Sequence, residues 1–340
     1  MISEYTSISG NIFFNGKMRS GTISFDGGTI EFKEGTPSGS ATIGTLIPAP
    51  INSHTHIGDS FVREEPSGNL AEVVGPGGFK ERQYRSHGPE EIKGGILATM
   101  ELMRLRGTAS FIDFREGGPQ GSQLLKESGN LPLPIILGRP WEESDRTLDV
   151  ADGAGMSSIS DHDIEFLNKV AEKCHRLGKI FAIHVSEDHR EDIDTILSMK
   201  PDLLIHCLEC TDRDLKSISE EGVPVVITPR SNIFFGKRPD YQKFLKRGIS
   251  TFIGTDNVMT VVPDVLLEVE FLYLWQRSMT YMSPELILSM ATEWPRKFLK
   301  RHHITGIEDK FLFFGGARLS AYEIVSRSAM HDSAVVRLVP

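Results

Sequence analysis

Two histidines stand one residue apart in "INSHTHIGDS", where His54 and His56 follow an apolar run. On an extended strand, side chains at i and i+2 point to the same face, so these imidazoles would project toward one small volume. That arrangement brings two nitrogen ligands to one metal ion. The pair alone also fits a strand end with two partly exposed histidines, so the rest of the chain must decide.

Further candidate ligands follow other apolar runs. His184 lies in "FAIHVSED", His206 in "LLIHCLEC" and Asp256 in "FIGTDN". A lone histidine at a strand end is commonly structural, and an aspartate after a strand is commonly a helix cap. Taken together, these imidazoles and the carboxylate suit zinc, iron or a similar first-row cation. The set therefore predicts a metal site.

The apolar runs that carry these residues alternate with helix-like stretches. One helix is predicted over "PEEIKGGILATMELMRLRG", and others begin near Asp161, Glu191, Asp212, Asp240 and Pro263. Repeated β then α indicates a parallel sheet covered by helices. Eight candidate strands, the first in "TLIPAPI" and a weak fourth around "LDVADGAG", favour an α/β fold of the (β/α)8 TIM-barrel type. In such a barrel the candidate ligands would share the catalytic rim. An open doubly wound sheet is the alternative, although no GxGxxG opens a helix.

Both ends of the chain read as β structure. Near the start, "SISGNIFF", "SGTISF" and "TIEFKEG" are separated by the turn signals Asn15-Gly16 and Asp26-Gly27-Gly28. Near the end, "KFLFFGGARLSAYEIV" and "SAVVRLVP" are strand-like. We expect residues 1–46 and 307–340 to form a small β domain and residues 47–306 to form the barrel.

Composition and charge exclude several classes of function. Of the 340 residues, 39% are hydrophobic and 24% charged, the balance of a soluble globular protein. The net charge of −9 and the dispersed basic residues offer no footprint for nucleic acid. The most apolar helix-like run, "VLLEVEFLYLW", is interrupted by Glu268 and Glu270, so no membrane span is expected. A small-molecule substrate is expected, and a homo-oligomer is left open.

The chain ends and cysteines indicate a compartment. The start "MISEYTSISG" lacks the basic flank and apolar core of a signal peptide. Three cysteines in so long a chain, Cys174, Cys207 and Cys210, fit a reducing compartment, and we expect a cytoplasmic protein. Cys207 and Cys210 form a CxxC, which we interpret as buried thiols because no second CxxC accompanies it.

A series of motifs resembles the amidohydrolase superfamily, in order and over most of the chain. These are "LIPAPINSHTHIGDS", "IFAIHVSED", "LLIHC", "TPRSNIFFGKRPDYQKFLKRGISTFIGTDN" and "MATEWPRKFL". Within the superfamily they resemble the deaminase and chlorohydrolase branch, which includes guanine, cytosine and S-adenosylhomocysteine deaminases. The resemblance implies a (β/α)8 barrel with a β-sandwich formed by both termini. The closing stretch "TGIEDKFLFFGG" departs from the family by lacking the usual Ala-Asp pair.

The resemblance also implies the roles of individual residues. His54, His56, His184 and Asp256 would bind one divalent metal ion, zinc or alternatively iron. His206 would lie close to the metal-bound water, and Glu187 would be the proton-transfer carboxylate. Binuclear relatives carry a carboxylated lysine at the end of the fourth strand. No lysine lies near "LDVADGAG", which favours a single metal ion.

These roles predict a hydrolase of carbon–nitrogen bonds. Asp256 would accept a proton from the attacking water, His206 would orient it, and Glu187 would protonate a ring nitrogen of a heterocyclic amine before ammonia leaves. A helix-capping role for Glu187 and Asp188 is the alternative for that position. Hydrolysis of a cyclic or linear amide is the alternative reaction. An inactive metal-containing binding module is the alternative class.

Substrate recognition is predicted from three arginines that follow strands. Arg115 lies in "IDFREGG", Arg139 in "ILGRP" and Arg230 in "TPRSN". Each alone is commonly solvated or paired, but three on one rim suggest a substrate with a carboxylate or phosphate. The long, glycine-rich stretch Gly58–His87 has the character of a lid, with disorder as the alternative.

Overall fold

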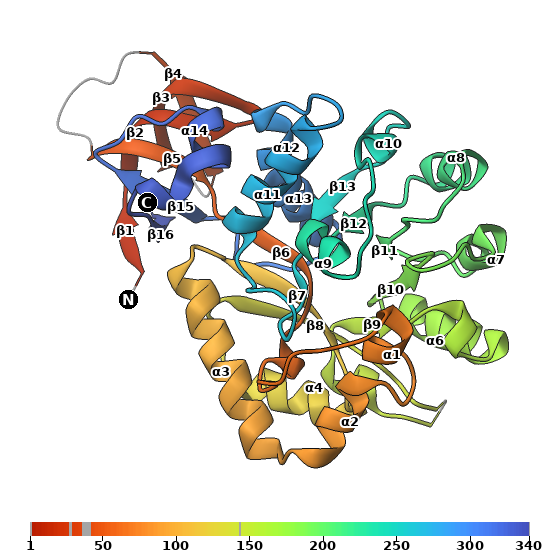
Figure 1. Ribbon diagram of the computed structural model, residues 1–340. Coiled ribbons are helices and arrows are strands. Elements are labelled where there is room, and N and C mark those ends of the chain that lie inside the picture. The colour runs from red at the N-terminus through yellow and green to blue at the C-terminus, as the bar shows by residue number, and fades with distance from the viewer. Residues whose placement is uncertain (1, 27–28, 36–41, 143, 340) are drawn as a thin grey trace.

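Two β-sheets organise the computed structural model, which describes residues 2–26, 29–35, 42–142 and 144–339 (Figure 1). The first sheet is parallel and carries the predicted ligands. Its strands are β6 (Ile51–His56), β7 (Ser110–Arg115), β8 (Leu133–Gly138), β9 (Gly153–Met156), β10 (Ile180–Val185), β11 (Leu203–His206), β12 (Val225–Ile227), β13 (Thr251–Ile253) and β14 (Asp256–Asn257).

The parallel sheet closes on itself through one short stretch of chain. Strand β13 pairs with β12 at one edge, and β14, which begins three residues after β13 ends, pairs with β6 at the other. All neighbouring strands between these edges are parallel, in the order β13-β12-β11-β10-β9-β8-β7-β6-β14. This arrangement fits the predicted TIM barrel.

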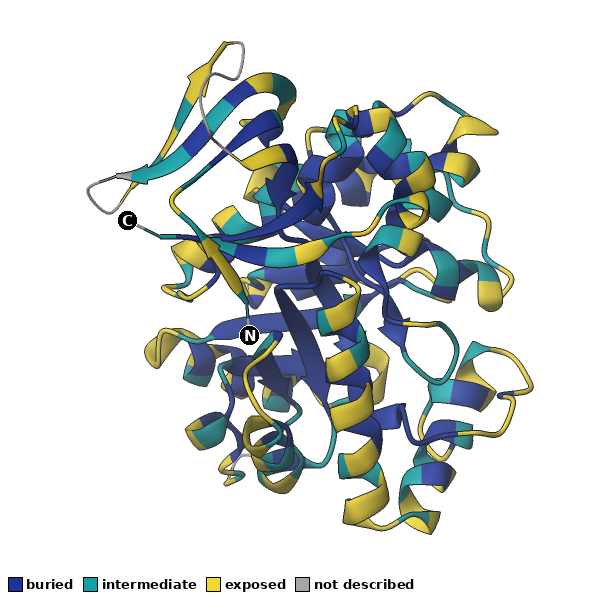
Figure 2. Ribbon diagram, turned by 90° about the vertical axis from the view of Figure 1, so that its left-hand side faces the viewer, coloured by how far each residue is buried: buried dark blue, intermediate teal, exposed yellow. Residues whose placement is uncertain are grey.

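Helices follow the strands and lie outside the sheet, and their buried sides face it (Figure 2). They are α3 (Pro89–Leu105), α4 (Gly118–Glu127), α5 (Thr147–Val150), α6 (Ile164–Arg176), α7 (Ile193–Ser198), α8 (Asp212–Glu221), α9 (Pro229–Phe234), α10 (Gln242–Leu245), α11 (Val265–Arg277), α12 (Pro284–Ala291) and α13 (Glu293–Arg301). Every predicted helix is present, with starts that differ by at most three residues. Local capping explains such starts: at α8, Thr211 and Asp214 form a reciprocal capping box.

The first predicted barrel strand is placed differently, and the fourth is shorter than the predicted stretch. Residues of "TLIPAPI" up to Pro48 belong to β5 (Thr42–Pro48) in the second sheet, and the first barrel strand is β6. Pro48 and Pro50 divide the apolar run, because proline donates no hydrogen bond to a ladder. The predicted fourth strand is confirmed as β9, but the first half of "LDVADGAG" forms the short helix α5.

The second sheet is built from both ends of the chain, which lie side by side at the upper left of Figure 1. Its order is β1 (Ser3–Tyr5), β16 (Ala334–Leu338), β15 (Lys310–Gly315), β5, β2 (Ser7–Phe14), β3 (Lys17–Asp26) and β4 (Thr29–Glu34). Strand β15 runs antiparallel to β5, and β1 runs parallel to β16. The two ends of the chain therefore meet in one sheet, whereas the division at residues 46 and 306 stays a prediction.

One strand prediction near the C-terminus is wrong. One turn prediction falls on residues that the structure does not describe. The "AYEIV" part of "KFLFFGGARLSAYEIV" forms helix α14 (Ala321–Arg327). A reciprocal capping box between Ser320 and Glu323 begins this helix and outweighs the β-branched residues that favour a strand. The Asp26-Gly27-Gly28 turn signal falls on residues 27–28, which lie outside the described part of the chain.

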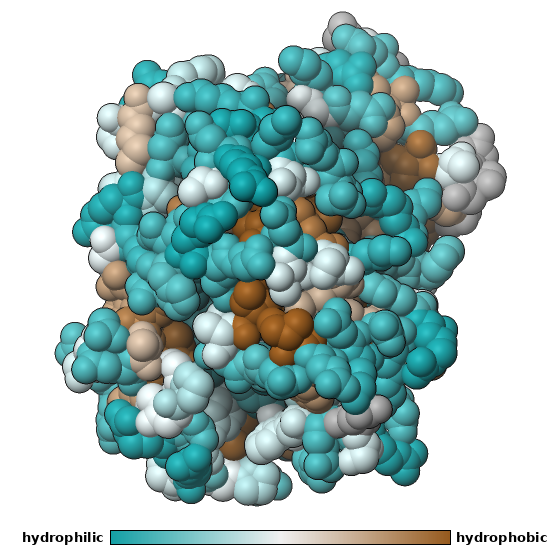
Figure 3. Space-filling model, turned by 90° about the vertical axis from the view of Figure 1, so that its right-hand side faces the viewer, coloured by the Kyte–Doolittle hydropathy of each residue, from teal (hydrophilic) through white to brown (hydrophobic). Residues whose placement is uncertain are grey.

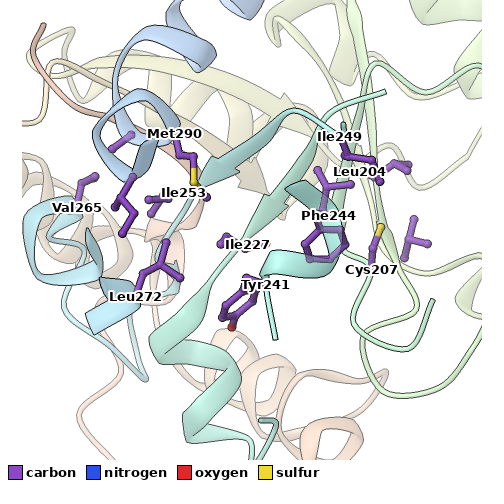
Figure 4. Close-up of a cluster of buried hydrophobic side chains, with 14 of the residues drawn as sticks. Leu204, Cys207, Ile227, Tyr241, Phe244, Ile249, Ile253, Val265, Leu272 and Met290 are labelled. Atoms are coloured by element: carbon purple, nitrogen blue, oxygen red, sulfur yellow. The ribbon is translucent and has the colours of Figure 1, made fainter. Parts of the chain in front are cut away.

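A large apolar cluster supports the helices around β11, β12 and β13 (Figure 4). In it, Leu204, Ile227 and Ile253 come from these strands, and Tyr241 and Leu272 come from the covering segments. Cys174, Cys207 and Cys210 are free and buried, which confirms the interpretation of the CxxC as buried thiols.

The outer surface is mainly polar on the face shown in Figure 3, where hydrophobic side chains appear only in small areas. Among the residues that the structure describes, no helix has the length and apolar character needed to cross a bilayer.

Candidate metal centre and active site

The predicted ligands come together at the carboxyl ends of the barrel strands. His54 and His56 lie on β6, His184 on β10, His206 at the end of β11 and Asp256 at the start of β14. The candidate ligand atoms of His54, His56 and His184 lie within 4.8 Å of one another, as do those of His54, His206 and Asp256. His54 belongs to both groups, so all five side chains surround one small volume.

The distances within this volume are short. Asp256 Oδ1 lies 3.3 Å from His54 Nε2 and 3.6 Å from His56 Nε2. The Nε2 atoms of His56 and His184 lie 3.4 Å apart. These separations suit donors that share one central ion.

Outer partners fix which nitrogen of two histidines faces this volume. His184 Nδ1 donates to the carbonyl oxygen of Met156 at 2.8 Å, and His56 Nδ1 donates to Glu116 Oε1 at 2.8 Å. Because a carbonyl and a carboxylate only accept, both protons are assigned to Nδ1, and both Nε2 atoms present lone pairs. Two lone pairs at 3.4 Å repel each other unless a cation lies between them.

Buried ring nitrogens without partners also fit a cation. Both ring nitrogens of His54 and the Nε2 atom of His206 are buried, and none of them has a hydrogen-bond partner among the described residues. Burial lowers the pKa of His206 to about 3, and burial together with Lys80 lowers that of His56 to about 4. These imidazoles are therefore neutral near pH 7, the form that binds metals. The residues present thus fit a divalent metal ion.

Backbone geometry and hydrogen bonds aim Asp256 and His206. Asp256 has φ +69° and His206 has φ +71°, a region that residues other than glycine rarely adopt. Ser231 Oγ donates to Asp256 Oδ2 at 2.7 Å, and Asn257 Nδ2 donates to Asp256 Oδ1 at 2.8 Å. The carboxylate of Asp256 is therefore held from two sides.

Glu187 lies beside His206, with 3.3 Å between Glu187 Oε2 and His206 Nε2. Burial, with a further effect from Asp256, raises the pKa of Glu187 well above its ordinary value. Asp192, and not Glu187 or Asp188, caps the next helix α7 by accepting from the backbone of Asp194. The helix-capping alternative for Glu187 therefore fails.

A cavity of about 690 Å³ opens onto these residues. The residues that line it include His56, His184, His206, Glu187 and Asp256. Its walls come from the loops after β8 and β9 and from the predicted lid segment, residues 58–87, which contains the helices α1 (Leu70–Val74) and α2 (Phe79–Ser86). The volume is in the range of small-molecule sites.

The amidohydrolase family model matches residues 45–310, which is most of the chain. The chain belongs to the amidohydrolase family. It is 35% identical over 279 residues to a protein of Methanothermobacter thermautotrophicus named "Putative aminohydrolase", covering 73% of this chain and 72% of that one. It is 25% identical over 293 residues to a 5-methylthioadenosine/S-adenosylhomocysteine deaminase of Caldicellulosiruptor saccharolyticus, covering 72% and 65%.

A solved deaminase structure has the same overall fold. The structure of Helicobacter pylori aminofutalosine deaminase, in complex with methylthio-coformycin, matches with a TM-score of 0.73 at 17% identity and covers 97% of each chain. With the family match and the deaminases among the curated relatives, this chain is a hydrolase that acts on carbon–nitrogen bonds.

Of the three predicted arginines, the amidohydrolase cavity receives only Arg139. It lines the wall, its Nε is buried without a hydrogen-bond partner, and it forms no ion pair with any described residue. Arg115 is buried behind the cavity and donates to Tyr84 Oη at 3.3 Å. Arg230 donates to Glu268 from its backbone nitrogen at 2.6 Å and from its guanidinium. Contact of Arg115 and Arg230 with substrate is therefore not supported.

Residues that support the amidohydrolase site but were not predicted from the sequence include Glu116, Lys80, Ser231 and Asn257. Glu116, whose carboxylate holds His56, directly follows Arg115, so the strand-end criterion that singled out Arg115 could have found it. Lys80 lies 2.5 Å from Glu116 but sits in the segment between β6 and α3, where no local pattern marks it.

Proposed function

We propose that this amidohydrolase is a metal-dependent aminohydrolase that releases ammonia from a heterocyclic amine such as a purine, pyrimidine or pterin. The observation that carries the proposal is the buried convergence of His54, His56, His184 and Asp256 on one volume, with Glu187 facing the same cavity. The deaminases among the relatives support the same reaction.

The metal would be a single divalent ion held by His54, His56, His184 and Asp256. Three imidazoles and one carboxylate suit zinc, with iron as the alternative. When bound, such an ion supplies Lewis-acid activation of water near neutral pH.

The chain's own residues would carry the protons. Asp256 accepts a proton from the attacking water. His206, whose Nε2 has no hydrogen-bond partner in the described part of the chain, orients that water. Glu187, whose burial raises its pKa and favours the acid form, donates to a ring nitrogen and makes the neighbouring carbon electron-poor. The carbon–oxygen bond forms, Asp256 passes the proton from water to the amine, and the carbon–nitrogen bond breaks as ammonia leaves. The proton of the new hydroxyl returns to Glu187, which leaves a ring carbonyl in the product.

The substrate is proposed to be a small molecule with a carboxylate or phosphate group. Arg139 supports this, because it lines the cavity wall half-buried and its guanidinium has no carboxylate partner among the described residues. We further propose a cytoplasmic protein without a nucleic-acid or membrane partner, with a homo-oligomer left open. The shared sheet of both chain ends supports a small β-sandwich domain of residues 1–46 and 307–340.

Metal analysis followed by an ammonia-release screen over purines, pyrimidines, pterins and triazines tests the proposal. We expect about one equivalent of a divalent metal and turnover of at least one heterocyclic amine. Glu187→Gln is expected to keep the metal and lose about 100-fold or more in kcat. Glu172→Gln, an exposed position on α6, is the matched control and is expected to leave both unchanged.

Other outcomes of the screen would overturn the proposal. Turnover of cyclic or linear amides without turnover of amines would assign amide hydrolysis, since the same activated water can attack a carbonyl. Bound metal without turnover of either panel would favour a binding module. A fully active Glu187→Gln variant would show that Glu187 does not transfer the proton.

A further inference from the structure

Glu116 joins a predicted metal ligand to a separate segment of the chain. Its Oε1 lies 2.8 Å from His56 Nδ1 and 2.5 Å from Lys80 Nζ. Its Oε2 accepts a hydrogen bond from Tyr84 Oη at 3.5 Å. One largely buried carboxylate therefore holds the His56 imidazole and also accepts from two side chains that belong to neither β6 nor β7.

Both of those side chains come from helix α2. Lys80 and Tyr84 are four residues apart, so they lie on the same face of the helix and reach the same carboxylate. Tyr84 is also fixed by Arg115, whose Nη2 donates to its hydroxyl oxygen at 3.3 Å. Helix α2 is thus attached to the end of β7 at two successive turns.

Lys80 has three polar partners on different segments of the chain. Its Nζ donates to Asn257 Oδ1 at 3.0 Å and lies 3.7 Å from Asp59 Oδ2, in addition to its contact with Glu116. Only 7% of the residue is exposed, and a lysine is rarely so buried unless it is paired. Asn257 in turn donates to Asp256, and Glu116 holds His56. The ammonium of Lys80 therefore contacts the supporting residues of two predicted ligands.

We propose that Lys80 and Glu116 are positioning residues that hold His56 with Nε2 toward the metal centre and couple metal binding to the docking of helix α2 over the cavity. The inference rests on the proposed metal centre but not on the identity of the substrate. Without Glu116, the proton of His56 is free to move to Nε2 and the imidazole is free to turn. Without Lys80, Glu116 loses the ammonium group that pairs with it, and helix α2 loses its contacts with Glu116, Asn257 and Asp59.

Binding free energies are reciprocal, which gives the coupling a measurable form. If docking of α2 strengthens metal binding, then metal binding must strengthen the docking of α2 by the same factor. A direct role of Lys80 and Glu116 in contacting substrate makes a different prediction: KM would rise, while metal affinity without substrate would stay unchanged.

The test measures the dissociation constant for Zn²⁺ by chelator competition, in the full chain and without substrate. Lys80→Met and Glu116→Gln are each expected to bind Zn²⁺ about 10- to 100-fold more weakly. Their combination is expected to bind no more weakly than the weaker single variant, because the two residues act as one unit. Arg85→Met, which removes an exposed positive charge from the same helix, is the control and is expected to bind as the unaltered chain does.

Hydrogen exchange provides the second readout. Zn²⁺ is expected to slow exchange of the α2 amides in the unaltered chain and in Arg85→Met, but not in Lys80→Met. Where a single variant does not fold, the double variant keeps the test valid, because it leaves no unpaired buried charge at this pair.

The possible failures are distinguishable. An unaltered chain that binds no Zn²⁺ or other divalent ion would overturn the proposed function. An unaltered chain that binds Zn²⁺, together with a double variant that keeps its affinity and its metal-dependent exchange, would overturn the positioning role alone. A raised KM with unchanged Zn²⁺ affinity would assign Lys80 and Glu116 to substrate contact instead.

Discussion

His56 and His184 face each other with their Nε2 atoms 3.4 Å apart, and neither atom carries a proton for the other to accept. Both rings donate hydrogen bonds from Nδ1, His56 to Glu116 and His184 to the carbonyl oxygen of Met156. The folded chain therefore stores a repulsion that a cation would relieve, and this relationship underlies the first prediction.

Removing the metal is expected to destabilise the folded protein. A ligand that binds only the folded state, present at about 1,000 times its dissociation constant, stabilises it by about 4 kcal/mol. We expect calorimetry to show a lower melting temperature after treatment with a chelator and recovery after Zn²⁺ is added back. Identical melting curves with and without chelator would contradict the metal centre.

Ser231→Ala is expected to weaken metal binding with little loss of stability. The hydroxyl donates to Asp256 Oδ2 at 2.7 Å in a buried setting, so its removal leaves that oxygen without its donor. Loss of such an outer partner typically costs about 10- to 100-fold in metal affinity or activity. Ser198→Ala, which removes an exposed hydroxyl bonded to Thr195, is the control. Equal Zn²⁺ affinities of the two variants would argue against this role.

Arg230→Met is expected to lower the free energy of unfolding by about 3–5 kcal/mol, because it removes the guanidinium that pairs with the buried carboxylate of Glu268 and leaves only the backbone donor. Urea unfolding measures this change. We expect the midpoint to fall while KM stays near that of the unaltered chain. A raised KM with an unchanged free energy of unfolding would instead show that Arg230 contacts the substrate.

Arg139→Met is expected to behave in the opposite way. Since no described residue pairs with this guanidinium, its loss should change the free energy of unfolding by less than about 0.5 kcal/mol. KM should rise for a substrate that carries a carboxylate or phosphate, and not for its uncharged analogue. Equal KM values for Arg139→Met and the unaltered chain would contradict the proposal that the substrate carries an anionic group.

Asp214→Asn is expected to lower the free energy of unfolding at pH 7. The free energy of unfolding of the variant is also expected to fall less steeply as the pH is lowered. The hydrogen bonds from Arg190, reinforced by Thr211 against the opposing effect of burial, lower the pKa of Asp214. Because the folded-state pKa lies below the unfolded one, the stabilisation is present above about pH 4 and is lost as the pH falls further. Urea unfolding at pH 7 and pH 3.5 checks this. Parallel pH profiles of the variant and the unaltered chain would contradict it.

Local patterns were sufficient for the ligand set. The two-residue period of a strand places His54 and His56 on one face, and the apolar runs before His184, His206 and Asp256 mark strand ends that meet at one rim. Each of these signals needs only a few neighbouring residues, and the structure brings all five side chains together.

The first barrel strand and the C-terminal helix show where local patterns were ambiguous. An apolar run divided by Pro48 and Pro50 supplies strands to two different sheets, and only the pairing partners distinguish them. At α14, β-branched residues favoured a strand, but the capping box of Ser320 and Glu323 was present in the sequence as a helix signal.

By itself, the sequence determined the order of strands and helices in the barrel and the candidate ligands of one metal ion, because these follow from periodicity and strand ends. Only the tertiary structure decided what the other charged groups do. Glu116 meets His56 across 60 residues, and Arg230 meets Glu268 across 38. The partner that offsets the desolvation of a buried charge is chosen by packing, and so it could not be predicted from neighbours in the chain.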